Sequence, residues 1–471
     1  MRRPLALLIF LTLVTLSIAA APLLAQEDCP AAVKQALDAA ITACTGIVRN
    51  TVCYGNNRVI ATDFDGAALN NFDAPGNILD LLNLGGLATF PFDTTSNTWG
   101  VAMLAVQADL PDTLPGQNVT LVVFGDVALQ NEVSPGQTVT PKSLAGKSTS
   151  NPNLRLGPGK SYAVAGNLNS NQDVTVIGRS EANDWLQLLV NNEIRWVAAQ
   201  FIDVTGDLST LPVADTSASP QLFTKPLQAF RIRSTPRGSK CDEVPGDGVV
   251  IQAPKDTTVN FLVNGIQMSV GSTAILRPGA TDDSLQVATL AGSIGLTSGG
   301  VEATIQPGFI ADTTAGSAPG DADRYTYDEV RSLPLGLLPE EVNAPPPDGT
   351  VISAFACHYK RNGVWPDIIP ADKPIIFSEA LGGSSYESAQ RARENSVVKL
   401  TFDGHAINRW GISDPYESNS SINAASGQDR GSAIFQDWWF VVPHPQPGKH
   451  NAKLTWVTDR TTDYSCAFTV R

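Results

Sequence analysis

The sequence predicts a mainly β, multi-domain chain that holds a small β-barrel, a rolled β domain and a C-terminal β-sandwich, plus one short N-terminal helix. The 39 glycines and 32 prolines among 471 residues favour many short strands joined by turns. Few stretches carry the apolar period of a long helix. Polar stretches rich in Ser, Thr and Pro at 131–149, 205–225 and 313–350 are typical of linkers. These linkers divide the chain into about four folded segments, in keeping with its length.

The first 25 residues have the pattern of an export signal. Arg2 and Arg3 precede an apolar run over 5–21, and Ala25 is followed by polar residues, which predicts cleavage after Ala25. The alternative is an uncleaved membrane anchor, for which the run is short, because a spanning helix needs about 20 residues. We therefore expect an extracytoplasmic protein, secreted or at the cell surface, that meets a membrane only through an uncleaved signal segment.

The acidic balance of the chain excludes one class of partner. The formal net charge is −14, and removal of Arg2 and Arg3 with the signal makes it two units more negative. Nucleic acids and anionic membranes are bound by clustered Lys and Arg. We therefore expect no nucleic-acid role.

The cysteines indicate an oxidising compartment. Their even number and the export signal favour disulfides, and no Cys-x-x-Cys pair supports a zinc site, so no metal site is predicted. Cys357 and Cys466 flank one C-terminal domain and are expected to pair. The six cysteines are Cys29, Cys44, Cys53, Cys241, Cys357 and Cys466.

The four remaining cysteines leave their pairing open. Residues 30–43 have a helical pattern, which would hold Cys29 and Cys44 about 20 Å apart at ~1.5 Å per residue. A disulfide needs its Cα atoms within about 7 Å. Cys29 and Cys44 are therefore expected to pair with Cys53 and Cys241, in either order.

Residues 26–130 form an N-terminal α+β module of unknown role. The helix predicted over 30–44 has an apolar face that includes Val33, Ala36 and Ile41. The apolar run 121–127 predicts a buried strand that ends in a turn. No motif in this segment carries chemistry.

Residues 142–213 have the clearest pattern in the chain. A Gly-Pro-Gly turn at 157–159 follows Asn-Leu-Arg, and the run 174–179 reads Val-Thr-Val-Ile-Gly-Arg. Two further strands follow, the first beginning with Trp185 and the second containing Trp196 near its end. A turn at 191–192 joins them, where Asn-Asn tolerates the positive φ of a tight hairpin. Alternate apolar residues place one face of these strands inward.

These pieces, in this order, resemble the bacterial SH3 family, whose pattern is Asn-Leu-Arg-x-Gly-Pro-Gly, then Val-x-Val-x-Gly-Arg, then Trp-Leu followed by Trp-Val. The resemblance covers about 70 residues and implies a small barrel of five to seven strands. It also implies a module that binds cell-wall or surface glycans or peptides.

Four side chains of this module are candidate ligand contacts: Tyr162, Arg179, Trp185 and Trp196. Aromatic rings in a groove suit a sugar or a peptide. The alternative is that both tryptophans fill the core, the commoner role of Trp in so small a barrel. Arg179 has a local alternative too, an ion pair with Glu181 or Asp184.

Residues 241–312 are predicted to form a rolled β domain of short strands separated by Gly-centred turns. Asn264-Gly265 is a strong signal for a type I′ hairpin turn. The segment is similar to FecR-type extracytoplasmic domains in its repeated short strands and its closing Pro-Gly at 307–308. FecR proteins relay signals through a membrane helix, and only the domain type is implied here.

Residues 350–471 are predicted to form a β-sandwich with a probable disulfide. Alternation over 464–470 indicates a half-buried last strand, with 351–357 as the first strand. Asp403-Gly404 predicts a turn, and 384–395 a short helix or a long loop. The pattern resembles immunoglobulin-like sandwiches in architecture alone.

The chain lacks the usual signatures of an enzyme. It has no Gly-x-Ser-x-Gly elbow, no His-Glu-x-x-His and no phosphate-binding Gly loop. We therefore expect no enzyme and no cofactor. The predicted function is binding of envelope polymer or peptide through the module at 142–213. The alternatives are a structural or adhesive surface protein without a small ligand, and a hydrolase with an unrecognised site.

Overall fold

The computed structural model describes residues 29–93, 95–96, 98–108, 110, 117–135, 142–190, 193–214, 223, 225–234, 244–353, 368–413, 416–418, 433–458 and 460–471. The predicted export signal at 1–25 lies outside these residues. The fold is mainly β, as predicted, with strands in several sheets and a few short helices. In the described part of the chain, no helix is both long and apolar enough to cross a membrane.

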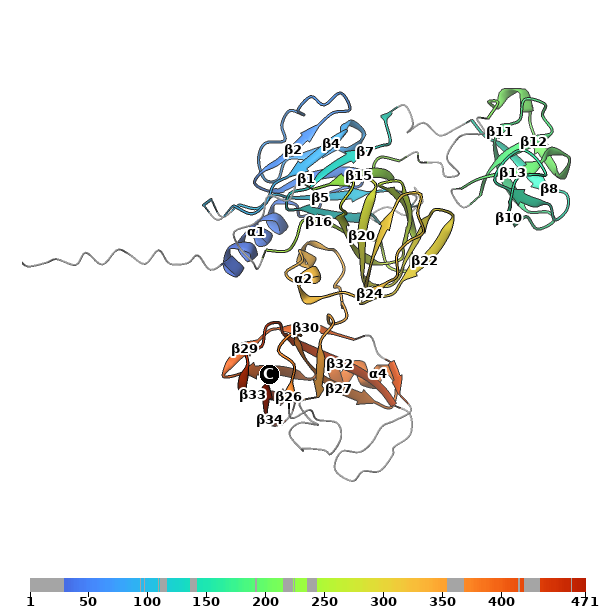
Figure 1. Cartoon of the computed structure of the whole chain (residues 1–471). Coiled ribbons are helices and arrows are strands. Elements are labelled where there is room, and N and C mark those ends of the chain that lie inside the picture. The colour runs from blue at the N-terminus through green and yellow to red at the C-terminus, as the bar shows by residue number, and fades with distance from the viewer. Residues whose placement is uncertain are drawn as a thin grey trace, which may run out of the picture.

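Two large sheets form the central body of the molecule (Figure 1). The first has the order β24 (Asp323–Arg324), β23 (Phe309–Thr314), β20 (Ser284–Ala291), β19 (Thr273–Pro278), β16 (Gly248–Gln252), β6 (Val119–Phe124), β5 (Val101–Val106), β1 (Thr51–Asn56) and β3 (Ile78–Asp80). The second has the order β2 (Val59–Thr62), β4 (Gly86–Thr89), β7 (Ala128–Asn131), β15 (Ala229–Arg233), β17 (Val259–Val263), β18 (Ile266–Val270), β21 (Ile294–Ser298) and β22 (Val301–Ile305).

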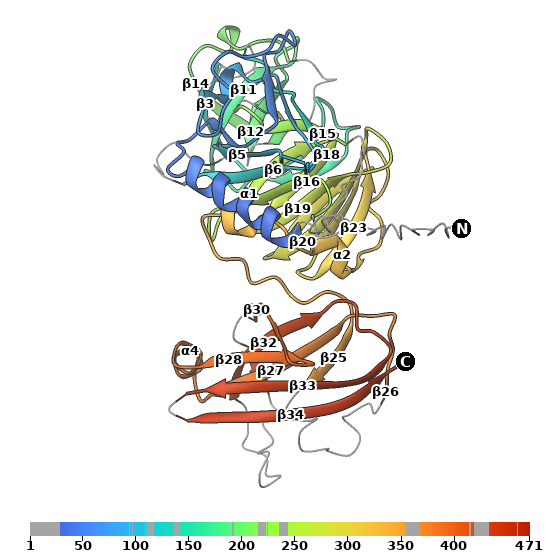
Figure 2. The same ribbon diagram turned by 90° about the vertical axis from the view of Figure 1, so that its left-hand side faces the viewer.

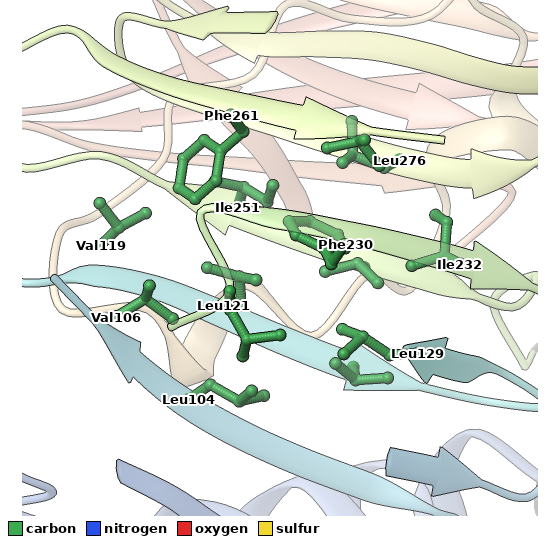
Figure 3. Close-up of a cluster of buried hydrophobic side chains, with 14 of the residues drawn as sticks. Leu104, Val106, Val119, Leu121, Leu129, Phe230, Ile232, Ile251, Phe261 and Leu276 are labelled. Atoms are coloured by element: carbon green, nitrogen blue, oxygen red, sulfur yellow. The ribbon is translucent and has the colours of Figure 1, made fainter. Parts of the chain in front are cut away.

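A continuous apolar core holds these two sheets together (Figure 3). Because side chains alternate between the faces of a strand, Leu104 and Leu121 face this core while their chain neighbours face the other side of the sheet. Phe230 and Phe261 meet edge to face, with ring centroids 6.1 Å apart. The core therefore draws on residues more than 150 positions apart in the chain.

Helix α1 (Cys29–Ala43) covers the other side of the first sheet (Figure 2). Its Ala36 and Ala40 are buried, whereas Ile41 is 39% exposed, so the buried face is narrower than predicted. A Cβ at Gly55 of β1 would lie 3.2 Å from the Ala40 Cβ, so small residues on both sides let the helix approach the strand closely. Helix α1, strand β1 and strand β2 follow one another directly in the chain.

A disulfide between Cys44 and Cys53 fixes the end of this helix to β1. It is one of the pairings that the sequence left open. Cys241, a candidate partner of Cys29, lies outside the described residues, and the Cys29–Cys241 pairing stays a prediction.

The predicted division between 26–130 and 241–312 is corrected by the strand pairing. β6 pairs with β16, with Leu121 opposite Ile251, so the two segments share the first sheet. β15 pairs with β7 on one side and with β17 on the other, so they share the second sheet as well. Each segment alone would leave unpaired strand edges and half of an apolar core exposed. The FecR resemblance of 241–312 stays a prediction.

The module predicted at 142–213 is inserted into this body. It forms one seven-stranded sheet around a small core of its own. Its order is β10 (Val164–Asn167), β9 (Asn153–Arg155), β13 (Glu193–Ala198), β12 (Trp185–Val190), β11 (Asp173–Arg179), β8 (Leu144–Ser148) and β14 (Ile202–Thr205). The chain enters from β7 and returns to β15, where Asn131 and Phe230 are register partners. Both connections therefore begin at neighbouring positions of one sheet.

The C-terminal part is a sandwich of two five-stranded sheets, as predicted. One contains β25 (Thr350–Ser353), β27 (Ile375–Gly383), β32 (Ala433–Val442) and β30 (Arg409–Ile412), with β31 (Tyr416–Ser418) also paired to β32. The other contains β26 (Ile368–Ile369), β34 (Thr461–Val470), β33 (Gly448–Val457), β28 (Val397–Phe402) and β29 (His405–Ile407). Helix α4 (Tyr386–Glu394) occupies the segment expected to be a helix or loop.

Cys466 of β34 is a disulfide cysteine, as predicted. Its predicted partner Cys357 lies outside the described residues. The turn expected at Asp403-Gly404 is present, with positive φ at both residues (48° and 83°) between β28 and β29.

The linker predicted at 313–350 is held in place at Pro345. The Pro345 carbonyl accepts a hydrogen bond from the Tyr325 hydroxyl (2.6 Å) and another from the Trp410 indole N–H (3.1 Å). Tyr325 belongs to the segment that covers the first sheet, and Trp410 lies on β30 of the C-terminal sandwich. Burial raises the pKa of Tyr325 well above its ordinary value, so its hydroxyl stays protonated and able to donate.

Candidate functional site

The loop between β9 and β10 of the inserted module presents an exposed aromatic ring. A Cβ at Gly157 would lie 2.3 Å from Cδ1 of Tyr162, so only glycine lets the ring pack against this part of the loop. The Tyr162 side chain is nevertheless 42% exposed. The Gly-Pro-Gly turn of the sequence thus serves to seat Tyr162 at the surface.

Arg155 fixes the same loop from β9. Its Nη1 donates to the carbonyl of Tyr162 (2.7 Å) and to the carbonyl of Lys160 (3.1 Å). Charge-assisted bonds of this kind are stronger than neutral ones. The loop therefore has a defined conformation, with a guanidinium bonded to the backbone carbonyl of Tyr162.

Strand register places the other aromatic candidates on the face that carries Arg155. Arg155 lies opposite Val164 on one side and opposite Trp196 on the other. Trp196 in turn lies opposite Gln187, and Trp185 is on the same face two residues before Gln187. The side chains of Arg155, Val164, Trp185 and Trp196, together with Tyr162 beside them, are called the outer face below.

Burial separates the two tryptophans on this face. Trp196 is only 2% exposed, so its ring is buried on the face opposite the core residues Leu186 and Val197, and its role as a ligand contact stays a prediction. Trp185 is half-buried at the start of β12. Its indole retains open surface, so Trp185 remains a candidate contact.

Arg179 has a local structural role instead of facing the other candidates. Its Nη1 donates to Asn183 Oδ1 at 2.9 Å, so the local partner is Asn183 and not Glu181 or Asp184. Its backbone N–H donates to the Pro212 carbonyl at 3.1 Å, which holds the C-terminal end of the module against β11. The structure therefore brings Trp185 and Trp196 to one face, with the backbone carbonyl of Tyr162 bonded to Arg155 of that face, and leaves Arg179 apart from them.

A carboxylate near Arg179 caps the last turn of the module. The backbone N–H of Ser209, then its hydroxyl, hold the pKa of Asp207 below its ordinary value, with a smaller contribution from Arg179. Asp207 thereby stays ionised as the cap of a short 3-10 turn.

Three residues of the outer face region were not predicted from the sequence. Leu156 and Val164 are apolar yet 51% and 53% exposed in the β9–β10 hairpin. Arg155 was seen only as part of a motif. Their positions follow from strand register and burial, which the sequence pattern does not give. The one usable signal in the sequence for an exposed apolar pair is an apolar residue on each side of the Gly-Pro-Gly loop.

A seven-stranded antiparallel sheet around one small core, with an exposed aromatic loop at one edge, defines the class of small SH3-like β-barrels. Residues 150–203 match the family model of the bacterial SH3 domain, and this part of the chain is a bacterial SH3 domain. No curated protein matches the chain. The resemblance stated from the sequence is confirmed over these residues.

Proposed function

We propose that the chain is an exported, non-catalytic protein that binds a cell-envelope glycan or peptide through its bacterial SH3 domain. The family match supports a binding module, with members that typically work at or outside the cell surface. The outer face supports contact with sugar or peptide groups, because Tyr162 offers an open ring and Arg155 stabilises the loop that carries it.

The insertion of the SH3 domain is the observation that carries this proposal. The module leaves and rejoins the central body at adjacent strands, so two connections tether it while its own strands form a separate sheet. Its core is also separate from that of the body. A module attached in this way adds nothing to the core of the body, which favours a role in presenting a surface to a partner.

The test is co-sedimentation of the full-length chain with purified cell-envelope fragments. We expect Tyr162→Ala to weaken binding about tenfold or more, the loss typical of one aromatic contact at a binding centre. Tyr386→Ala is the matched control, since Tyr386 on α4 is also an exposed tyrosine (57%) but lies in the C-terminal sandwich. Equal binding by both variants, or no binding by the native chain, would reject the proposal.

A further inference from the structure

The apolar face of helix α1 is used only in part for packing. Leu37 packs against the apolar core between the helix and the first sheet, and Ile41, four residues further on, continues the same face. Ile41 is nevertheless 39% exposed. The helix ends at Ala43, and a turn at 44–46 takes the chain toward β1. The last large apolar side chain of the helix therefore lies at a surface that the fold does not cover.

Ile41 lines a cavity of about 470 Å³ between three segments of the central body. Helix α1, which lies across β5 and β6 (Figure 2), forms one wall together with its turn. Strands β5 and β6 form a second wall with Met103 and Thr120, and the 3-10 turn Leu335–Leu337 belongs to the third. Met103 and Leu337 are buried whereas Ile41 is exposed, so Ile41 lies at the mouth. The volume is within the range of small-molecule sites.

The lining of this cavity is mainly apolar, and none of the described residues that form it carries a charge. Two neutral polar side chains interrupt it, those of Asn118 and Thr120. Arg49 Nε donates to Asn118 Oδ1 at 3.2 Å, which leaves the amide N–H groups of Asn118 to donate elsewhere. Neither these N–H groups nor the Thr120 hydroxyl bonds to a described residue. An apolar cavity with a few convergent polar groups is the usual form of a small-molecule site.

The size of the cavity and the strands around it argue against a docked segment of protein. The volume corresponds to a space about 8 Å on a side, whereas an α-helix with its side chains is about 10–12 Å in diameter. An added strand needs an open sheet edge. β5 and β6 both lie inside the first sheet, where β5 pairs with β1 and β6, and β6 with β5 and β16. A small molecule is the occupant that fits.

Gly336 in the 3-10 turn leaves room on the third side of the cavity. Its φ lies outside the left-handed region, so the backbone does not require glycine here. A Cβ at Gly336 would meet only Cδ1 of Ile41, at the ordinary contact distance of 3.8 Å. Packing therefore does not require glycine either. A longer side chain at this position would extend beside Ile41 into the space that a ligand needs.

We propose that this cavity binds a neutral, mainly apolar small molecule that carries a hydrogen-bond acceptor. Contact with the apolar lining removes ligand surface from water, and the Asn118 N–H groups and the Thr120 hydroxyl donate to the acceptor. A charged group would lose its hydration without a counter-ion in the lining. The neighbouring cation, Arg49, already donates to Asn118 Oδ1 and to the Gln117 carbonyl. The site lies in the central body and does not depend on the function proposed for the SH3 domain.

Fluorescence titration of the full-length chain with N-phenyl-1-naphthylamine tests the proposal, because this neutral probe brightens in apolar surroundings. We expect saturable binding that 1-decanol reverses at neutral pH. Decanoate, which has the same chain length and a charged carboxylate, should need a concentration at least about tenfold higher, since its charge finds no counter-ion in the lining.

Two substitutions place the probe in the cavity. Gly336→Leu should fill it, and Ile41→Glu should put a charge at its mouth, so each should weaken probe binding about tenfold or more. Val48→Glu is the matched control, because Val48 is also an exposed apolar residue (63%) close to the end of α1 but does not line the cavity.

The outcomes separate this site from the SH3 domain. Tyr162→Ala should leave probe binding unchanged, whereas loss of probe binding in that variant would place the probe on the SH3 domain and reject the cavity. If Gly336→Leu does not fold, as judged by circular dichroism, Ile41→Glu decides, because the Ile41 side chain is already exposed. Absence of saturation, equal binding by Ile41→Glu and Val48→Glu, or tighter binding of decanoate than of 1-decanol would overturn the proposal.

Discussion

Trp185 and Trp196 show how strand register and burial assign different roles to the same residue type. Both lie on the outer face of the SH3 sheet, yet Trp196 is 2% exposed and Trp185 is half-buried. From the sequence, each could be a groove residue or a core residue, with the core as the commoner role of Trp in so small a barrel. Alternation gives the face on which a side chain lies, but burial on that face depends on segments that can be distant in the chain, and periodicity carries no information about them.

Truncation of the two tryptophans should therefore have different consequences. We expect Trp196→Ala to lower the free energy of unfolding of the SH3 module by about 3–5 kcal/mol, the usual loss for a fully buried aromatic residue. Trp185→Ala should cost clearly less, because its ring is already partly in water. Urea denaturation of both variants, followed by circular dichroism, measures the difference. Equal losses would show that the burial assigned to Trp196 is incorrect.

Short hairpin elements were predicted well because their signals are local. Asn264-Gly265 has positive φ at both residues (49° and 79°), as a type I′ turn requires. The Asn264 side chain, however, is fully buried, and it bonds to the backbone N–H and C=O of Ile232 in β15. That second role joins the turn to a strand of another segment. It depends on tertiary structure, so the sequence did not reveal it.

The Asp403-Gly404 turn also makes contacts beyond its own hairpin. Asp403 accepts hydrogen bonds from the Asn451 backbone N–H (2.8 Å) and faces Nδ1 of His450 (2.6 Å). Burial alone would raise the pKa of Asp403. The Asn451 N–H and the His450 imidazole outweigh that effect and hold the pKa below its ordinary value, with a smaller effect of His405. The turn is thereby tied to β33.

This arrangement predicts an acid-dependent loss of stability in the C-terminal sandwich. A carboxyl group whose folded pKa is depressed stabilises the fold above its unfolded pKa of about 3.9, and this contribution disappears as the pH falls through the folded value. We expect Asp403→Asn to lower the melting temperature at pH 7 and to flatten its decline below about pH 4. Calorimetric scans of both chains from neutral to acidic pH provide the measurement. Parallel melting curves at every pH would contradict the assigned role of Asp403.

At the scale of the whole molecule, the sequence predicted the segments better than their assembly. The mainly β class, the SH3 domain and the C-terminal sandwich were all recognisable, because each has local periodicity or a contiguous motif. The shared sheets of the central body were not, because β6 and β16 are separated by the entire SH3 domain. The apolar composition of a strand such as Val119–Phe124 predicts that the strand is buried. It does not predict which strand pairs with it, because the pairing depends on the tertiary fold.

The candidate site followed the same division. The sequence supplied Trp185, Tyr162 and the loop that holds Tyr162, since these belong to one contiguous motif. It did not supply the outward position of Val164 or the tie from Arg155 to the loop, which depend on cross-strand register.

Because the SH3 domain is inserted between two neighbouring strands, its removal tests directly whether it carries the envelope binding. A chain that lacks residues 142–213 keeps every strand of the central body, and the residual connection still joins the neighbouring strands β7 and β15. We predict that its central body melts at an unchanged temperature while its co-sedimentation with purified envelope fragments falls to background. Retention of native envelope binding by this shortened chain would contradict the assignment of binding to the SH3 domain.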